Sequence, residues 1–435
     1  MRWFRPRKQP ATLKMSTNSI SLTTAVQSTE GVDDGDLPPF DRLGRVLYHH
    51  RTQGKAVEGV HIRGITDALR AEGVPVDVMS LPGADPYSSP AAMSPTTQAT
   101  RLMKSVAKFP EPLFELTELA YNAVAGWRIL RYLWAHQDVK LIYERYSLYM
   151  FVTLVIARAK GIPIVFEVND SAIVERVRPL FFRSLASAIE RFIFKKADGL
   201  VFVSQIFRDR TTAEYGSIAP SIVTPNAANI AQFSYTSEQR KATRSQLGLD
   251  DKIVCGYLGA FVPWHAIDQF VYTIADRLED SPHLCLLLVG DGETYPKVAT
   301  FVKERNLLDR IILTGRVAHK EVPGLLSAMD MAVLPSAGDY TSPVKLFEFM
   351  ASGIPAVAPD FEPIKEVLTE GQNGWMFKAK DIEASVNAVL KMSSQTDDLK
   401  RVGENAREYI RTERQWRNNV VQLAQFVSQL TSARH

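Results

Sequence analysis

Short apolar segments alternate with amphipathic ones along most of this chain, and this alternation restricts the possible folds more than any other feature. The first half starts with the strand-like RVLYHH at Arg45, followed by a helical pattern over Val57–Ala71. The second half repeats the order, from KIVCGYLG to IPAVAP. Near-continuous apolar strands separated by helices are typical of parallel sheets covered on both faces. We therefore predict an α/β fold with two doubly wound domains, and we expect an active site in a central cleft between them.

The remaining elements of the first half follow the same rule. We expect helices around Leu113–Trp134, over Leu148–Lys160 and over Leu180–Lys196. The runs VKLIYE, IPIVFEV, GLVFVS and SIVTPN are expected strands, and a Pro- and Ser-rich loop is expected near residues 81–100.

The domain boundaries are predicted from lapses in this pattern. The start MRWFRPRKQP is basic, but Thr, Ser and Asn follow it in place of the apolar segment of a signal peptide. We therefore expect a disordered leader over residues 1–40. The alternating pattern gives way to polar residues at Ala227–Thr236. We place the boundary there, between an N-terminal domain, residues 41–228, and a C-terminal domain, residues 229–400. Residues 401–435 are expected to form helices that can pack back across the domains.

Composition excludes some classes of protein. A net charge of +3 over 435 residues argues against nucleic acid as the main partner. The two cysteines, Cys255 and Cys285, lie in apolar runs without metal-ligand spacing, so we expect buried, reduced thiols and a cytoplasmic location. The longest uncharged apolar run, Tyr146–Ala157, falls short of the ~20 residues that span a bilayer. The chain is therefore expected to be soluble or peripheral to a membrane.

The segment YTSPVKLFEFMASGIPAVAPD contains a cation at the start of a predicted helix. Ser342 is the expected N-cap and Pro343 the first helical residue, which places Lys345 at the third position. A cation is unfavourable there by ~0.3–1 kcal/mol, because the helix N-terminus is itself positive. An anion held by the amides near Val344 and by Lys345 would explain this residue.

Glu348 lies on the same face of this helix as Lys345. A carboxylate beside a phosphate site commonly accepts hydrogen bonds from ribose hydroxyls. The alternative is a surface ion pair between Lys345 and Glu348, which would contribute ~0.2–0.5 kcal/mol.

Three further loops of the second half support a nucleotide diphosphate site. GYLGAFVPWHAID places Gly259 at a turn and His265 near a helix start, where the ring can donate to a phosphate oxygen or simply pack locally. VGDGE contains a G-x-G turn, and TGRV ends an expected strand, so that its backbone could face a base.

In their order along the chain, these segments resemble the donor domain of retaining, nucleotide-sugar-dependent glycosyltransferases of family 4, which have the GT-B fold. The matching segments are GYLGAFVPWHAID, LLLVGDGE, LTGRVAHKEVPGLLSAMDMAVLPS and SPVKLFEFMASGIPAVAPD. The first half is similar to the acceptor domain of that family through YHHRTQGKAVEGVHIRGITDALRAEGVPVDV, LIYERYS, IPIVFEVND, ADGLVFVS and VTPNAANIAQF. The resemblance covers roughly residues 45–425.

The resemblance implies roles for residues of the second half. Glu348 would bind the donor ribose, Val317 would hold the base through its backbone, and Lys345 would bind the diphosphate with His265 close by. The other donor-binding residues implied are Gly259, Ser342, Pro343, Val344 and Tyr340. It also implies a metal-independent reaction without a cofactor, in which a UDP- or GDP-linked sugar is transferred with retention of configuration.

The sequence departs from the family pattern at two places. Tyr340, with Asp339 beside it, stands where the first of two paired glutamates is expected. Ala260 and His265 stand where many members have an arginine and a lysine for the diphosphate. The second departure moves the positive charge of the site onto Lys345.

Polar residues of the first half lie where strands are expected to end. A buried carboxylate needs a partner, and Arg145 is available to Glu144 or Glu167. One interpretation is a structural ion pair beneath the cleft. The other is an acceptor site, and its expected residues are Glu58, Gly59, His61, Arg145 and Asn169.

Two questions about partners and activity stay open at this level. The segment Arg176–Lys196 carries six basic residues and one acidic residue among apolar ones, so it is either an amphipathic helix with a solvated face or a contact with an anionic membrane. The latter would place the enzyme at the inner face of the cell membrane with a lipid-linked glycan acceptor, as in polysaccharide assembly. The alternatives to a glycosyltransferase are an epimerase of the same fold and a non-catalytic nucleotide-sugar-binding scaffold.

Overall fold

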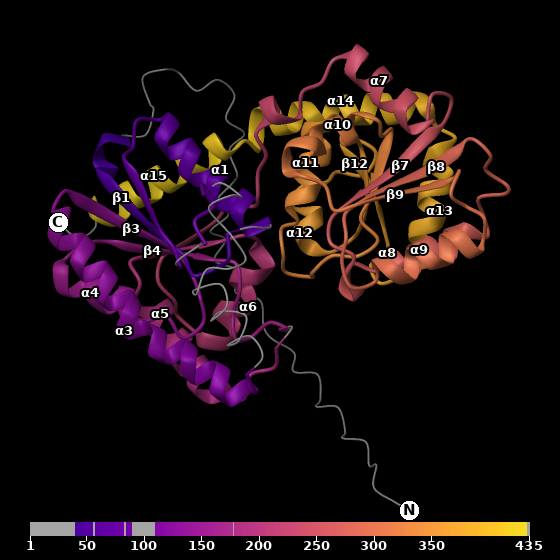
Figure 1. The fold of residues 1–435 in the computed structure, drawn as a ribbon. Helices are drawn as coiled ribbons and strands as arrows, with labels where there is room; N and C mark the ends of the chain where they lie inside the picture. The colour runs from indigo at the N-terminus through magenta and orange to yellow at the C-terminus, as the bar shows by residue number, and fades with distance from the viewer. Residues whose placement is uncertain (1–39, 55–56, 82–83, 89–108, 177, 433–435) are drawn as a thin grey trace, which may run out of the picture. The chain divides into compact units, whose positions relative to one another are not determined.

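The computed structural model describes residues 40–54, 57–81, 84–88, 109–176 and 178–432. The leader predicted over residues 1–40 lies outside this part of the chain except for Phe40, which opens a 3-10 turn, η1 (Phe40–Leu43). The Pro- and Ser-rich loop predicted near residues 81–100 also lies largely outside it. The described chain forms two parallel six-stranded sheets with helices on their faces (Figure 1).

The first sheet has the strand order β2-β1-β3-β4-β5-β6, and every pair is parallel. The chain leaves β1 towards one edge and then returns to build β3 to β6 on the other side, so the topological switch point lies between β1 and β3. Ligands of open α/β sheets bind beyond such a point. The strands are β1 (Arg45–His49), β2 (Val76–Met79), β3 (Val139–Arg145), β4 (Ile164–Val168), β5 (Gly199–Phe202) and β6 (Ser221–Val223).

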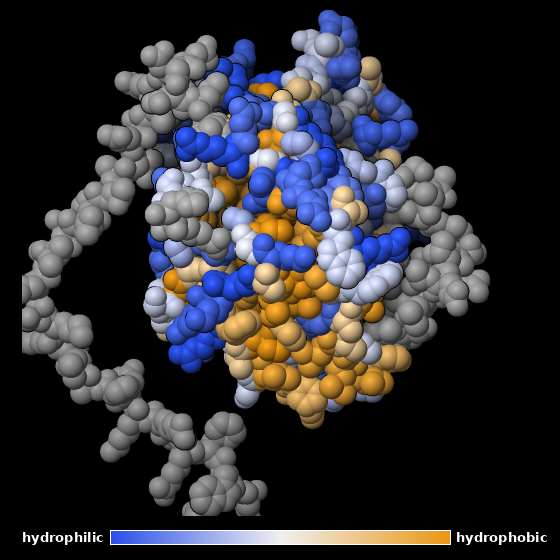
Figure 2. Space-filling model, turned by 90° about the vertical axis from the view of Figure 1, so that its left-hand side faces the viewer, coloured by the Kyte–Doolittle hydropathy of each residue, from blue (hydrophilic) through white to orange (hydrophobic). Residues whose placement is uncertain are grey.

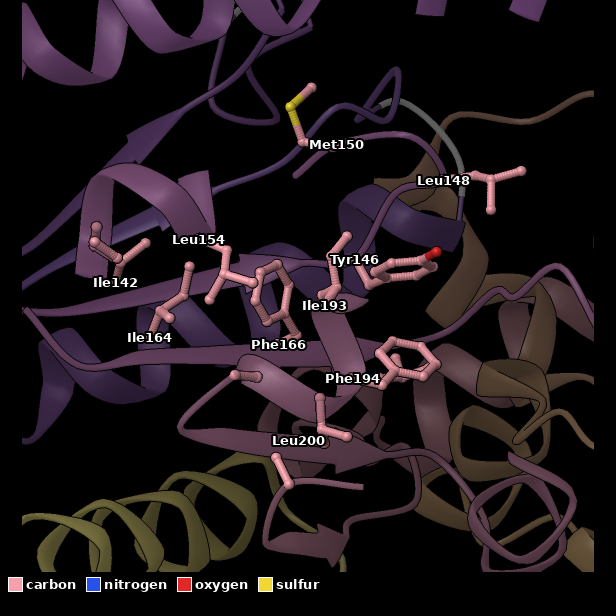
Figure 3. Packing of buried hydrophobic residues seen from close by; sticks show 14 of the residues in the cluster. Ile142, Tyr146, Leu148, Met150, Leu154, Ile164, Phe166, Ile193, Phe194 and Leu200 are labelled. Carbon is pink, nitrogen blue, oxygen red and sulfur yellow. The ribbon is translucent and has the colours of Figure 1, made fainter. Parts of the chain in front are cut away.

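Alternating side chains of this sheet enter two separate cores. On one face, Ile142 and Phe166 pack with α3 (Glu111–Ala135), α4 (Val152–Lys160) and α5 (Arg183–Lys196). Figure 3 shows this core, in which the Tyr146 and Phe194 rings lie 4.9 Å apart between centroids. On the other face, Tyr48 and Tyr143 pack with α1 (Val57–Ala71) and α15 (Trp416–Ser432).

The last helix of the chain, α15, therefore belongs to the core of the first sheet. A Cβ on Gly64 of α1 would lie 2.3 Å from the Trp416 ring, so α1 and α15 approach as closely as a glycine permits. Gly199 of β5 similarly makes room for Phe426. The two chain segments that connect the halves run side by side, because the Ala228 amide donates to the Arg414 carbonyl at 3.0 Å.

The second sheet has the order β12-β11-β10-β7-β8-β9, again entirely parallel. Its switch point lies between β7 and β10. The strands are β7 (Ile253–Leu258), β8 (Leu284–Val289), β9 (Ile311–Gly315), β10 (Met331–Val333), β11 (Ala356–Pro359) and β12 (Gly374–Phe377). The other helices are α6 (Gln205–Tyr215), α7 (Ser237–Leu247), α8 (Ile267–Ala275), α9 (Tyr295–Glu304), α10 (Val322–Ser327), α11 (Val344–Ala351), α12 (Glu362–Lys365), α13 (Ile382–Ser393) and α14 (Thr396–Glu413). Short 3-10 turns are η3 (Ile230–Phe233), η4 (Pro263–His265) and η5 (His319–Glu321).

Several predicted boundaries were wrong, and tertiary contacts explain two of them. The helix predicted from Leu148 starts at Val152, because Tyr149 has φ 67° and Asn122 of α3 accepts the amides of Phe151 and Val152. The helix predicted from Leu180 starts at Arg183, because the amides of Phe181 and Phe182 donate to Glu115 of α3. Sequence analysis also missed β12, a four-residue edge strand. Both cysteines are buried and unpaired, as predicted.

Candidate active site

The loops that follow β7 and β10 meet at the switch point of the second sheet. A Cβ on Gly259, just after β7, would lie 2.7 Å from the Lys345 amine at the start of α11. The same amine lies 4.8 Å from the centroid of the Tyr257 ring at the end of β7, a cation–π distance. The structure therefore brings together Gly259 and Lys345, two predicted site residues that are 86 positions apart in the sequence (345 minus 259).

The start of α11 differs from the prediction by one residue. Pro343 is the N-cap, Val344 is the first helical residue, and Lys345 is the second. Ser342 does not cap the helix, because its hydroxyl accepts the amide of Asn226 at 2.9 Å. The Val344 and Lys345 amides still begin the helix and have no acceptor one turn earlier within it, as an anion site requires.

Lys345 and Glu348 do not form the alternative surface ion pair. Glu348 is only 6% exposed, and Lys345 is half-buried. Burial lowers the pKa of Lys345 to about 7 and raises the pKa of Glu348 to about 7, and in each case the other charge opposes the shift. Strongly shifted pKa values of buried groups are typical of functional sites, and the Lys345 amine beside the first amides of α11 suits an anionic ligand.

His265 points its Nδ1 into its own loop. That nitrogen lies 2.8 Å from the Ala260 carbonyl, which can only accept, so Nδ1 carries a hydrogen. Burial and the Lys345 charge lower the pKa of His265 to about 4. The neutral ring therefore presents Nε2 as an acceptor, and donation to a phosphate, as predicted, would require this nitrogen to take up a proton.

Tyr340 packs against the first half of the chain. Its ring lies 4.9 Å from Phe207 of α6, its carbonyl accepts the Ser204 hydroxyl at 2.6 Å, and burial raises its pKa to about 12. Its neighbour Asp339 forms an ion pair with Arg210 at 2.9 Å. A donor-binding role for Tyr340 stays a prediction, while the described contacts of its ring are with α6.

The G-x-G turn after β8 packs against the backbone of the Gly259 loop. Gly290 has φ 137°, and a Cβ there would lie 1.9 Å from the Gly259 carbonyl oxygen. Its amide donates to the Gly315 carbonyl at 3.1 Å, which joins this turn to the end of β9. Val317, the residue expected beside a base, follows two positions later and is half-buried.

A second polar group lies at the end of the first sheet, around Glu167 of β4. Its carboxylate lies 2.6 Å from Arg145, 2.5 Å from the Asn169 amide and 2.9 Å from His61 Nε2. These cations and the amide hold the pKa of Glu167 at about 2 despite complete burial. The structure thus brings together the predicted acceptor residues His61, Arg145 and Asn169. Of the two carboxylates that were available to Arg145 in the sequence, Glu167 forms the ion pair with it.

Glu58 and Gly59, the other two predicted acceptor residues, lie in the first turn of α1, which spans the predicted helix Val57–Ala71. A Cβ on Gly59 would lie 2.2 Å from the Gly54 carbonyl oxygen, so this helix start is pressed against the segment that follows β1. Glu144 is bound instead by His49, whose Nδ1 lies 2.9 Å away.

A chain of hydrogen bonds links Glu167 to the start of α11. His61 Nδ1 lies 2.5 Å from the Asn226 side-chain oxygen, and the Asn226 amide nitrogen donates to the Ser342 carbonyl. His61 thus lies between the Glu167 carboxylate, on its Nε2 side, and Asn226, on its Nδ1 side. Sequence analysis missed Asn226, whose only signal was its position at the end of the expected strand SIVTPN.

Sequence analysis also missed Glu190 of α5, a buried carboxylate surrounded by donors. It accepts from Ser171, Tyr146, Tyr215 and the Ala172 amide. Glu190 therefore holds the loops that follow β3 and β4. The sequence feature that could have identified Glu190 is that it is the one acidic residue in the apolar and basic segment Arg176–Lys196.

Neither a metal cluster nor a membrane-spanning helix occurs in the part of the chain that the structure describes. No group of three or more His, Cys, Asp or Glu side chains there could hold a metal ion. None of the described helices combines the length and apolar character needed to cross a bilayer.

Two family models match the chain, one on each sheet. Glycosyltransferase Family 4 matches residues 59–232, and Glycosyl transferases group 1 matches residues 239–409. The alpha-D-kanosaminyltransferase of Streptomyces kanamyceticus is 21% identical over 363 residues, which are 79% of this chain and 92% of that relative.

Solved structures share the architecture at low sequence identity. The sucrose-phosphate synthase of Thermosynechococcus elongatus superposes with a TM-score of 0.68 and 20% identity, over 89% of this chain and 100% of that chain. Anabaena HepE in complex with UDP-glucose superposes with a TM-score of 0.63 and 17% identity, over 89% and 100%. These likenesses confirm the predicted GT-B fold.

Proposed function

Since this chain belongs to the group 1 glycosyltransferases, we propose that it moves a sugar from a nucleotide diphosphate donor to an acceptor held by the first sheet, with retention of configuration. The family assignment confirms the predicted transferase and disfavours an epimerase or a scaffold. HepE, which is similar in fold, has been solved in complex with UDP-glucose, and this supports a nucleotide sugar as the donor.

The observation that carries the proposal is the convergence of Lys345, Gly259 and the first amides of α11 at one switch point. A diphosphate there would contact an amine and helix amides while lying against a glycine that leaves room for it. Glu348, one turn further along α11, would accept from the ribose hydroxyls. Val317, two residues after β9, would hold the base through its backbone.

The proposed reaction needs no dedicated base. The bond between the sugar carbon and the diphosphate oxygen breaks, and the acceptor oxygen forms a new bond to that carbon from the same face. The acceptor proton passes to the departing diphosphate. Charge that develops on the diphosphate is stabilised by Lys345 and the α11 amides, and the proposal includes neither a metal ion nor a cofactor.

The test is incubation with a panel of UDP- and GDP-sugars, with and without candidate acceptors. We expect one donor to release its nucleoside diphosphate in an acceptor-dependent manner, and the product to keep the anomeric configuration of the donor. Conversion of the free nucleotide sugar into an epimer, or an inverted product, would contradict the proposal.

Binding of the donor is expected to take up about one proton per site at pH 8. The pKa of Lys345 is about 7 in the free protein, so most of its amine is neutral at pH 8. The charge of a diphosphate raises this pKa, and the amine then binds a proton from the buffer. Calorimetry in two buffers of different ionisation enthalpy measures the uptake, and the Lys345→Met variant should show none. Equal enthalpies in both buffers for the parent protein would count against a diphosphate beside Lys345.

We further propose a lipid-linked glycan as the acceptor, in polysaccharide assembly at the inner face of the cell membrane. The polar group around Glu167 is the acceptor site in this proposal. The basic, apolar character of the segment Arg176–Lys196 supports it.

A further inference from the structure

The three helices on one face of the first sheet expose apolar and basic side chains together. On α3, Trp127 is 61% and Trp134 is 66% exposed. Together these side chains form what we call the apolar–basic surface. Its large apolar members are Leu113, Leu116, Val124, Trp127, Trp134, Val155, Phe181, Leu185 and Phe192. Its exposed cations are Arg131, Arg158, Lys160, Arg183, Arg191, Lys195 and Lys196.

No acidic side chain of α3, α4 or α5, which are described throughout, is exposed. Glu115 and Glu190 are buried inside hydrogen-bond networks, and Glu111 and Glu118 are half-buried and paired with arginines. A solvated amphipathic face would carry both signs of charge and few aromatic side chains. This surface instead has the composition of helices that lie in the interface of an anionic bilayer.

The members of the surface belong to one rigid group of helices. A Cβ on Gly126 of α3 would lie 2.9 Å from Val152, so α3 and α4 are in close contact. Arg158 of α4 donates to the carbonyl of Lys196 in α5 at 2.9 Å. Glu115 of α3 accepts the amide of Phe181 at 2.5 Å. Figure 2 views the side on which these helices lie in Figure 1 and shows hydrophobic surface gathered in its lower part.

The N-terminal half of α3 lies against the loops that follow β1 and β3, and Arg145 is the last residue of β3. Asn122 donates to the Tyr149 carbonyl at 2.8 Å, in the loop after β3. Glu118 pairs with Arg51, in the loop after β1. The apolar–basic surface therefore begins at the edge of the sheet where the first switch point lies.

We infer that the apolar–basic surface docks the enzyme onto an anionic lipid bilayer. Trp127 and Trp134 enter the headgroup region, and the surrounding cations contact lipid phosphates. A second copy of the chain is disfavoured as the occupant, because a symmetric contact would place cations opposite cations. That docking delivers a lipid-linked acceptor to the first switch point rests on the proposed function. Docking itself can be measured without any reaction.

Vesicle flotation of the full chain, without donor, tests the inference. We expect co-flotation with phosphatidylcholine vesicles that contain phosphatidylglycerol and on the order of tenfold weaker binding to pure phosphatidylcholine. The double variant Trp127→Ser/Trp134→Ser should bind anionic vesicles on the order of tenfold more weakly. The matched control is Leu308→Ser, since Leu308 is 62% exposed in the second half of the chain, and it should float as the parent does.

A second variant separates charge from apolar insertion. Arg183→Gln/Arg191→Gln/Lys195→Gln should lose the preference for anionic vesicles and keep its melting temperature, since all three side chains are exposed. Unchanged flotation of the tryptophan variant would overturn the inference. So would a parent dimer in light scattering that the tryptophan variant converts to a monomer, because the surface would then bind a second copy. Docking without transferase activity would instead contradict only the proposed function.

Discussion

The Lys345→Met variant is expected to turn over about 10²–10³ times more slowly than the parent while keeping its fold. The amine lies beside Gly259 and the first amides of α11, where the diphosphate charge develops. Methionine keeps most of the length and volume of the side chain but removes the charge. Initial rates at saturating donor, measured with the donor and acceptor found in the panel, give the ratio of kcat values.

The control for this variant is Lys303→Met, since Lys303 is an exposed lysine in the last turn of α9. It should retain the parent rate. The melting temperature of Lys345→Met should not fall, because its replacement removes an unfavourably buried charge. Undiminished kcat in a folded Lys345→Met protein would refute the assignment of the diphosphate to this end of α11.

Gly290→Ala is expected to destabilise the protein by about 2–4 kcal/mol and to abolish donor binding. Its φ of 137° strains any residue with a Cβ, and that Cβ would lie 1.9 Å from the Gly259 carbonyl oxygen. The atoms nearest to this Cβ are backbone atoms of Gly259, so no flexible side chain can move aside. The loop that bears Gly259 must move, and it is the loop that faces Lys345.

Chemical denaturation measures the loss, and Gly324→Ala is the matched control. No atom lies within 4 Å of a Cβ on Gly324, which is inside α10. The control should therefore be neutral or slightly stabilising. A Gly290→Ala protein with parental stability and donor affinity would show that the Gly259 loop does not form part of the donor site.

The parts of the site that sequence analysis predicted are those that follow from strand order. Lys345 and Gly259 come after strands of a doubly wound sheet, and the carboxyl ends of parallel strands share one edge. The proximity of Glu348 to Lys345 was also predicted, since the two residues lie on the same face of one helix. These features depend on local pattern and topology alone.

The parts that could not be predicted depend on contacts between distant segments. The pairing of Asn226 with His61 and with Ser342 depends on how α1 and two loops meet, and neither loop has a pattern of its own. The hydrogen on His265 Nδ1 follows from the direction of the Ala260 carbonyl, which the sequence does not contain. The helix start at Val152 depends on Asn122, thirty positions earlier (152 minus 122).

The position of α15 has a consequence for how this protein is made. During synthesis, residues 40–223 leave the ribosome long before Trp416 and Phe426, which fill one face of their sheet. That face keeps its apolar side chains in water until α15 has been made, whereas the face covered by α3, α4 and α5 can close earlier. A gene fragment cut between the two halves would therefore encode a first half that is prone to aggregate, and adding residues 416–432 in trans should improve its solubility.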